Sequence, residues 1–213
     1  THDQVGNRAF GERLHALAPA GRERTALACL LLSPQVPLLF MGEEWAASTP
    51  FLFFCDFGPE LARAVARGRR GEFARFAAFA SEEAREAIPD PGAEATFAAS
   101  KLRWDERERS PHRERLALVG DLLARRRRHL VPRLAGMAGG GRMQVLNGVL
   151  RVEWTLGDGA LLRLLAHFGA GEAAVPPPLA GETVWEDGVE RAPDGDLVLL
   201  PGAVHVLVRP AAA

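Results

Sequence analysis

The chain has 213 residues, of which 26 are Lys or Arg and 27 are Asp or Glu, so its formal net charge is −1. Hydrophobic residues make up 47% and charged residues 25%, the balance of a globular protein with a sizeable core and room for one or two domains. The near-neutral charge argues against nucleic acid as a partner. No apolar stretch approaches the roughly 20 residues that a membrane span requires, which argues against a membrane protein.

The basic and sulfur-containing residues exclude several kinds of site. Lys101 is the single Lys beside 25 Arg, so the chain contains no phosphate-binding loop of the G-x-x-x-x-G-K-[ST] type. Cys29 and Cys55 are too few for a disulfide framework or a four-ligand zinc site, and the histidines lack metal-ligand spacing. We therefore expect neither a disulfide framework nor a zinc site and a reducing, cytoplasmic location, and we give the excess of Arg no functional weight.

The first 135 residues are predicted to be α/β. The continuously apolar run Val36–Met41, closed by Gly42, is typical of a strand that is buried on both faces in a parallel sheet. Residues 88–96 are rich in Pro, Gly and Asp and predict a loop. Apolar residues at helical spacing predict three helices, over 21–32, 59–80 and 111–130.

A glycine-rich segment, 136–141, is the clearest boundary in the chain. Beyond it, short strands alternate with turn signals about every ten residues, which indicates a small antiparallel sandwich or barrel. The predicted domains are therefore 1–135 and 136–213, the second a β-sandwich. The turn signals are Asn147-Gly148, Gly157-Asp158-Gly159, Asp187-Gly188, Asp194-Gly195 and Pro201-Gly202.

The segment His2-Asp3-Gln4 stands at the very start of the chain, just before the first helix. In an α/β barrel, functional side chains lie at the carboxyl ends of the strands, which is where this segment would be. An Asp in the same place also serves as a cap for the following turn. These three residues alone favour the capping role.

Four blocks of sequence stand out in the first half of the chain: THDQVGNR at 1–8, LLFMGEEW at 38–45, PFLFFCDF at 50–57, and 90–104, which ends in SKLRW. In this order and spacing they resemble the malto-oligosyltrehalose trehalohydrolases, members of the α-amylase family (glycoside hydrolase family 13). The resemblance covers residues 1 to about 135 closely and the β module only in kind. It implies that 1–135 is the last part of a (β/α)8 catalytic barrel, followed by a C-terminal β-sandwich domain.

The resemblance also implies an activity. The family hydrolyses the α-1,4 bond next to the trehalose end of malto-oligosyltrehalose, an α-glucan, and releases trehalose without a cofactor. Asp3 would be the third catalytic carboxylate, which stabilises the oxocarbenium-like transition state. His2, Gln4, Glu44 and Trp45 would contact the substrate, although a structural carboxylate is an equal alternative for Glu44. Thr1 stands where the family commonly has Asn, which leaves the role of that position open.

The two other carboxylates of a retaining glycosidase, the nucleophile and the general acid, follow the fourth and fifth barrel strands in this family. Both would lie upstream of Thr1, in the rest of the barrel. We therefore expect this chain to be a C-terminal fragment that is inactive by itself. Expressed alone, its first 135 residues are expected to aggregate or to stay partly disordered.

Two further patterns have competing explanations. The loop from Trp45 to Phe57 holds Trp45 and four Phe residues, which are suited equally to stacking on sugar rings and to packing against the barrel rim. The run Arg125–Arg128 wraps around its helix rather than lining one face, so we interpret it as a solvated helix end and not as a nucleic-acid site.

Two alternatives to the trehalohydrolase interpretation remain. The chain could belong to a glycogen-branching enzyme or another α-amylase relative, which share the helix–strand–Gly-Glu pattern. It could also be a non-catalytic carbohydrate-binding or structural remnant. The sequence that precedes Thr1 would discriminate, because only an enzyme requires an upstream Asp and Glu at the ends of two barrel strands.

Overall fold

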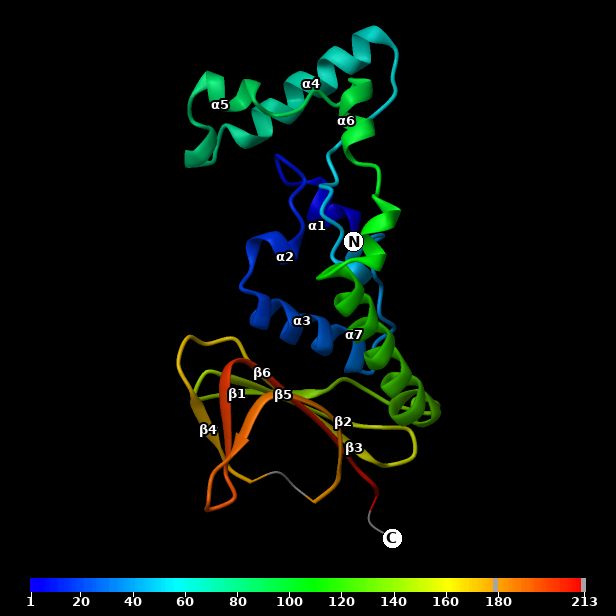
Figure 1. The fold of residues 1–213 in the computed structure, drawn as a ribbon, viewed down its shortest axis with the longest axis vertical. Helices are drawn as coiled ribbons and strands as arrows, with labels where there is room; N and C mark the ends of the chain where they lie inside the picture. The colour runs from blue at the N-terminus through cyan, green and yellow to red at the C-terminus, as the bar shows by residue number, and fades with distance from the viewer. Residues whose placement is uncertain (178–179, 212–213) are drawn as a thin grey trace. The chain divides into compact units, whose positions relative to one another are not determined.

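A computed structural model describes residues 1–177 and 180–211 (Figure 1). The chain divides into two compact units. We call the first the helical unit; it contains Thr1–Leu17 and Leu38–Leu116. The second, the sheet unit, contains Ala18–Pro37 together with the residues from Ala117 on. Each is described by itself below.

The helical unit consists of short helices joined by long loops, and none of its residues, all of which are described, lies in a strand. Single helical turns occur at Glu43–Trp45, Ala77–Phe79 and Trp104–Glu108. Helix α7 (His112–Arg125) begins in this unit and ends in the next. The other helices are α1 (His2–Gly6), α2 (Leu14–Leu17), α4 (Pro59–Phe73), α5 (Glu82–Glu86) and α6 (Glu94–Ala99).

Two predicted boundaries differ from the structure. The helix predicted over 59–80 ends at Phe73, where the chain turns so that the ring of Phe79 packs 5.2 Å from that of Phe73. Gly68 and Gly71 lower the helix propensity of this last turn, which favours an early end. The loop predicted over 88–96 is shorter in the structure, because α6 already begins at Glu94.

The strand predicted over Val36–Met41 is not formed. The segment has no regular secondary structure and pairs with no strand among the described residues, and the side chains of Val36 and Leu38 are 91% and 64% exposed. The backbone N–H and C=O groups of a parallel strand need a neighbouring strand as their partner. All strand pairs that the structure describes are antiparallel and lie in the sheet unit, so the parallel α/β arrangement expected for 1–135 is not formed by these residues.

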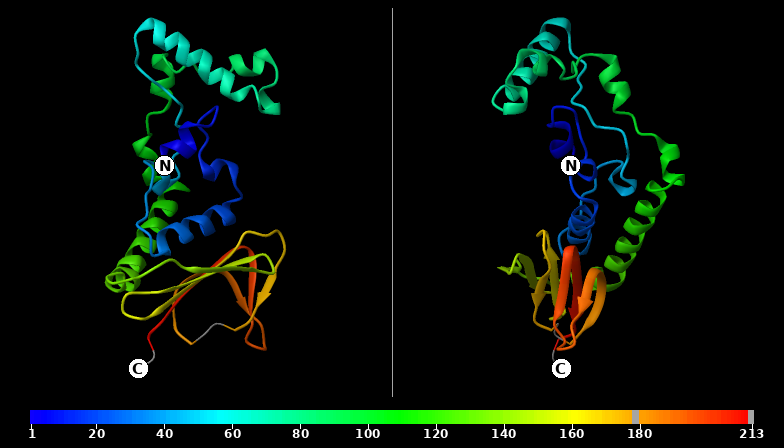
Figure 2. Two further views of the ribbon diagram at one scale, coloured as in Figure 1. Left: turned by 180° about the vertical axis from the view of Figure 1, so that it is seen from behind. Right: turned by 60° about the vertical axis from the view of Figure 1, so that its left-hand side comes forward.

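The sheet unit confirms the antiparallel β module. All six strands join in one sheet, rather than in two separate sheets of a sandwich. The strand order is β1-β2-β3-β6-β4, where β3 and β4 pair with different parts of one edge of β6 and β5 pairs with its opposite edge. The sheet bends around the long strand β6 (Figure 2). The strands are β1 (Arg142–Leu146), β2 (Val149–Thr155), β3 (Leu161–His167), β4 (Ala173–Val175), β5 (Glu182–Arg191) and β6 (Leu197–Arg209).

The predicted turn at Asn147-Gly148 is confirmed. Both residues have positive φ, 52° and 78°, and Leu146 pairs directly with Val149. This is the two-residue hairpin geometry that Asn-Gly favours. The turn predicted at Pro201-Gly202 is wrong, because β6 continues through it.

Gly202 lies inside β6 because helix α3 (Ala20–Leu32) packs against it there. The Thr25 hydroxyl donates to the Gly202 carbonyl oxygen. A Cβ atom at Gly202 would lie 2.7 Å from the carbonyl carbon of Gly21, and the residue has a φ of +83°. The Pro-Gly pair therefore provides a close approach of helix and strand, and the predicted helix over 21–32 is confirmed as α3.

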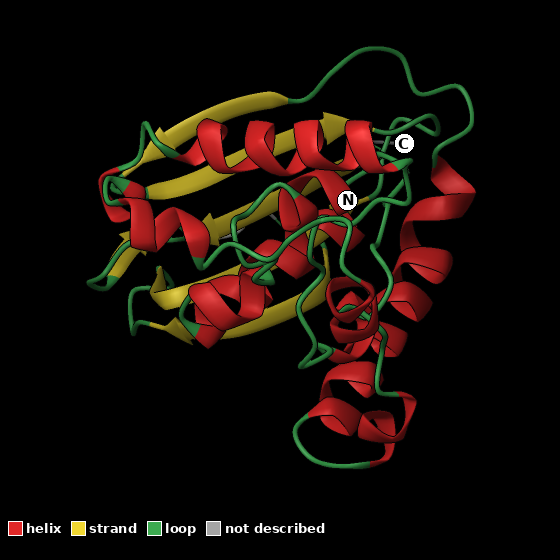
Figure 3. Cartoon of the chain, turned by 90° about the horizontal axis from the view of Figure 1, so that it is seen from above, coloured by secondary structure: helices red, strands yellow, loops and turns green. Residues whose placement is uncertain are grey.

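The core of the sheet unit lies along β3 and β6, in the sheet whose strands are yellow in Figure 3. Leu162, Leu199 and Val206 are completely buried there. At the end of α7 the chain widens into a π-helical turn, Arg126–Leu130, followed by the turn Val131–Arg133.

Arg126 corrects the interpretation of the arginine run. It is only 7% exposed, whereas Arg127 and Arg128 are exposed. The run does wrap around its helix, so only part of it reaches solvent. The buried guanidinium donates to four carbonyl oxygens at the end of α3, those of Leu31, Ser33, Pro34 and Gln35.

Candidate functional site

Three of the residues predicted to act on a substrate, His2, Asp3 and Gln4, lie at the exposed start of α1. His2 Nε2 lies 3.1 Å from Asp3 Oδ1, and the two side chains are 68% and 64% exposed. The Thr1 hydroxyl donates to Gln4 Oε1 at 2.5 Å. Thr1 itself occupies the N-cap position, so Asp3 is not the cap of α1. An exposed carboxylate beside an imidazole is suited to binding adjacent hydroxyl groups.

A row of rings leads away from His2. The ring centroids are 6.5 Å apart between His2 and Phe40 and 4.8 Å apart between Phe40 and Phe51. The row continues through Phe54, at 5.7 Å, to Phe97, at a further 5.2 Å. Three of these contacts are edge-to-face, the geometry that aromatic pairs prefer. The predicted site is thereby connected by packed rings to a neighbouring cavity.

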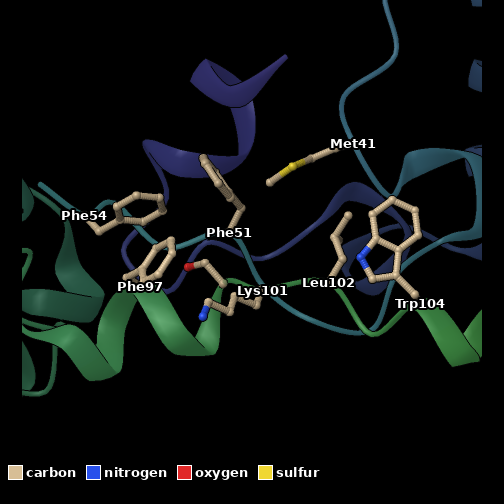
Figure 4. A pocket seen from close by; sticks show the side chains of 8 residues that line it. Met41, Phe51, Phe54, Phe97, Lys101, Leu102 and Trp104 are labelled. Carbon is tan, nitrogen blue, oxygen red and sulfur yellow. The ribbon is translucent and has the colours of Figure 1, made fainter.

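This cavity, which we call the aromatic hollow, has a volume of about 440 Å³ (Figure 4). The rings of Trp104 and Phe97 remain 57% and 44% exposed in it. The Lys101 amine lies 4.8 Å from the centroid of Phe97. The residues that line it are Met41, Phe51, Phe54, Phe97, Ser100, Lys101, Leu102 and Trp104.

The hollow is almost entirely apolar. The Ser100 hydroxyl, one of its few polar groups, is already engaged, because it accepts from the Leu52 N–H at 3.0 Å and donates to the Thr96 carbonyl at 3.0 Å. Among the lining side chains, the Lys101 amine and the indole N–H of Trp104 remain as donors for the hydroxyl groups of a ligand. Both a sugar face and an apolar segment of polypeptide fit such a surface, so the two explanations of the aromatic loop stay open.

Glu44 lies in a loop that buried side chains hold. Glu43 Oε2 accepts from the Phe40 N–H at 2.7 Å, so this carboxylate serves the backbone. Arg13 is 3% exposed and donates to the carbonyls at both ends of the loop, Met41 at 2.9 Å and Thr49 at 2.7 Å. Burial lowers the pKa of Arg13, and the charges of nearby carboxylates, Glu44 among them, oppose that effect. Glu44 thus stands near a buried cation, consistent with either role that the sequence left open.

The loop is also held at its middle. Glu106 accepts hydrogen bonds from the N–H of Ser48, at 3.0 Å, and from its hydroxyl. Burial raises the pKa of Glu106, but these bonds together with the charges of His112 and Arg103 outweigh it, so the net pKa lies below its usual value. Sequence patterns did not identify Arg13 or Glu106, because the partners of each lie far away along the chain.

Trp45 is packed inside the helical unit. Its side chain is 2% exposed, and its ring centroid lies 5.2 Å from that of Trp104. The guanidinium carbon of Arg107 lies 5.1 Å from the ring centroid of Trp104. The sugar contact predicted for Trp45 stays a prediction, and the exposed indole of this pair is that of Trp104. Its position after the SKLR block is the only sequence signal that could have drawn attention to it.

No three His, Cys, Asp or Glu side chains gather as metal ligands within the described ranges 1–177 and 180–211. In the same ranges no helix is long and apolar enough to cross a membrane. Cys29 faces the protein interior, where burial raises the pKa of its thiol to about 12.

Comparisons with known proteins bear on this resemblance. Residues 138–206 match a family described as a domain of unknown function, DUF3459. The malto-oligosyltrehalose trehalohydrolase of Deinococcus radiodurans is 44% identical over 172 residues, 80% of this chain and 26% of that protein. That of Arthrobacter ramosus is 50% identical over 127 residues, 59% of this chain and 21% of that protein. The chain is thus similar to malto-oligosyltrehalose trehalohydrolases over most of its length, which confirms the resemblance. It spans about a quarter of the length of these relatives.

Solved structures agree with this assignment. A Salmonella typhimurium protein with a provisional alpha-amylase name has a TM-score of 0.85 and 41% identity, covering 98% of this chain and 34% of that one. An isomaltulose synthase from Erwinia rhapontici has a TM-score of 0.55 and 13% identity, covering 90% of this chain and 39% of that one. The second similarity is one of fold alone.

Proposed function

We propose that this chain is the C-terminal part of a retaining α-glycosidase that hydrolyses the α-1,4 bond next to the trehalose end of malto-oligosyltrehalose and releases trehalose. The observation that carries the proposal is the 44% identity to a relative of that name over 80% of the chain. In this proposal 1–135 completes a catalytic barrel, 136–213 is its C-terminal β domain, and the enzyme is cytoplasmic and needs no cofactor.

Asp3 is the residue of this chain that acts on the transition state. Its carboxylate hydrogen-bonds the hydroxyl groups of the sugar that is cleaved and favours the distorted, oxocarbenium-like geometry. The exposure of Asp3 and its 3.1 Å contact with His2 support this role, because both groups are open to a ligand. Gln4 and Glu44 contribute contacts to the same substrate, whereas the buried Trp45 packs against Trp104. The nucleophile and the general acid come from outside residues 1–213.

The unpaired segment Val36–Met41 supports the barrel assignment. Its apolar side chains are exposed at Val36, Leu38 and Met41, and its backbone has no strand partner among the described residues. Exposed apolar surface of this kind marks a place where another part of a protein packs. In the proposed enzyme the remaining barrel strands cover this segment and complete its hydrogen bonds.

Incubation with malto-oligosyltrehalose tests the proposal, with this chain and the complete enzyme assayed side by side. We expect trehalose from the complete enzyme and none from the 213-residue chain. Maltose or branched glucan as the product would favour another α-amylase relative. Binding of the glucan by the complete protein without any product would favour a non-catalytic role. Trehalose released by the chain alone would overturn the assignment of the missing carboxylates.

A further inference from the structure

A buried arginine of α4 holds the helix that carries His2 and Asp3. The Arg69 side chain is 5% exposed. Its Nη2 donates to the carbonyl oxygens of Gly6 and Arg8, both at 2.8 Å. Gly6 is the last residue of α1, so these carbonyls lie at the helix C-terminus, where intrahelical partners are missing and a positive charge is favourable.

The guanidinium is itself fixed in place. Its central carbon lies 4.9 Å from the ring centroids of both Phe53 and Phe73. Nη1 lies 3.7 Å from Glu72, which is exposed. Burial lowers the pKa of Arg69 and the Glu72 charge raises it, but a guanidinium stays charged in proteins. The cation is thus aimed at the two carbonyls by neighbours on two different segments.

Other parts of the helical unit also pack closely against α1. A Cβ atom at Gly6 would lie 3.4 Å from the Phe51 ring, and Val5 is 5% exposed. A helix of five residues is far below the length that is stable by itself in water. The direction of α1 therefore depends on what holds its end, which is Arg69 together with the Phe51 ring.

From this geometry we propose that Arg69 is a positioning residue for Asp3. Asp3 and Gly6 are three residues apart in α1, about 4.5 Å along the helix axis. A shift of the anchored end therefore moves the carboxylate relative to the substrate. The inference rests on the catalytic role proposed above for Asp3. A misplacement of about 1 Å costs on the order of 100-fold in rate, while leaving contacts elsewhere along the substrate intact.

The test compares Arg69→Ala with Arg67→Ala in the complete enzyme to which the proposed function assigns this chain. Arg67 is exposed on the same helix, so its substitution removes the same chemical group without touching α1. We expect Arg69→Ala to lower kcat for trehalose release about 10- to 100-fold with little change in KM, and Arg67→Ala to leave both unchanged. Guanidinium ion, well below denaturing concentrations, should restore part of the kcat of Arg69→Ala, whereas the same concentration of NaCl should not.

A second variant, Arg69→Lys, tests the proposal if Arg69→Ala does not fold. Arg69→Lys keeps the charge, but its single ammonium lacks the fork that reaches both carbonyls. A lowered kcat with a Tm near that of the wild type supports the proposal. Unchanged kinetics in Arg69→Lys, or a loss of kcat that only follows the loss of folded enzyme, would overturn it. A wild-type enzyme that releases no trehalose would instead refute the proposed function, so the two failures are distinguishable.

Discussion

The two units of the chain satisfy their backbone polar groups in different ways. The sheet unit pairs its strands in antiparallel ladders, and residues such as Leu162 and Val206 are completely buried beneath them. The helical unit has no ladder, and its loops are held by single side chains: Arg13 at Met41 and Thr49, Arg69 at Gly6 and Arg8, and Glu106 at Ser48.

The difference indicates which unit is complete. The helical unit leaves large apolar side chains uncovered, with Leu38 64% and Trp104 57% exposed, next to a hollow of about 440 Å³. The sheet unit buries the apolar residues of β3 and β6 with its own strands and α3, although Met143, Val145 and Leu146 of the edge strand β1 stay exposed. We infer that the sheet unit has a core that makes it stable by itself, whereas the helical unit depends on additional packing for its stability.

The largest expected effect of this contrast is on amide hydrogen exchange in the chain expressed alone. Amides of β2, β3 and β6 should exchange only through global unfolding, while those of 38–58 exchange about 1,000-fold faster or more, because locally open segments have almost no protection. The first 135 residues should also promote aggregation. A monomer that melts in one cooperative transition, with equal protection in both units, would refute the contrast.

A matched pair of Leu→Ala substitutions sharpens it. Leu162→Ala removes a completely buried side chain of β3 and should lower the free energy of unfolding by about 3 kcal/mol. Leu38→Ala removes a side chain that is 64% exposed and should change it by less than about 0.5 kcal/mol. Urea unfolding measures both when it is followed by tryptophan fluorescence, to which Trp45 and Trp104 contribute in the helical unit and Trp154 and Trp185 in the sheet unit. Equal losses would mean that the two units share one core.

The smallest effect concerns pH. His205 is completely buried in β6, and this burial lowers the pKa of its side chain. The charge of Glu186 opposes the shift, whereas the charges of Arg191 and Arg163 lower the pKa further. The unfolded chain therefore binds a proton at this site more readily than the folded one. Stability should be full above the ordinary histidine pKa of about 6.5 and should decline as the pH falls below it. In His205→Gln, urea midpoints between pH 7 and pH 5 should decline less. An unchanged decline would assign the effect to other groups.

Where structure follows from neighbouring residues, the sequence predicted it well. The Asn147-Gly148 hairpin and the helix over 21–32 depend on local chemistry and were placed almost to the residue. Where structure depends on a distant partner, the sequence was insufficient. Pro201-Gly202 looks like a turn, but α3 packs against it within a strand, and Val36–Met41 looks like a strand but has none to pair with.

The candidate site shows the same limit. The block His2-Asp3-Gln4 was recognised from its residues, and the structure gathers it at one helix start. The side chains that hold the site could not be recognised. The excess of Arg over Lys was given no functional weight, yet Arg13, Arg69 and Arg126 are buried and each binds at least two carbonyl oxygens. The partners of Arg69 and Arg126 lie more than 60 residues away, beyond the reach of any local pattern.

The central claim is that Asp3 stabilises the transition state of trehalose release, and Asp3→Asn in the complete enzyme tests it most directly. The substitution keeps the shape of the side chain and removes its charge. We predict a loss of kcat of about 100- to 1,000-fold, with malto-oligosyltrehalose still bound and Tm within a few degrees of the wild type, because the interaction is made mainly in the transition state. A variant that releases trehalose within a few-fold of the wild-type rate would contradict the account.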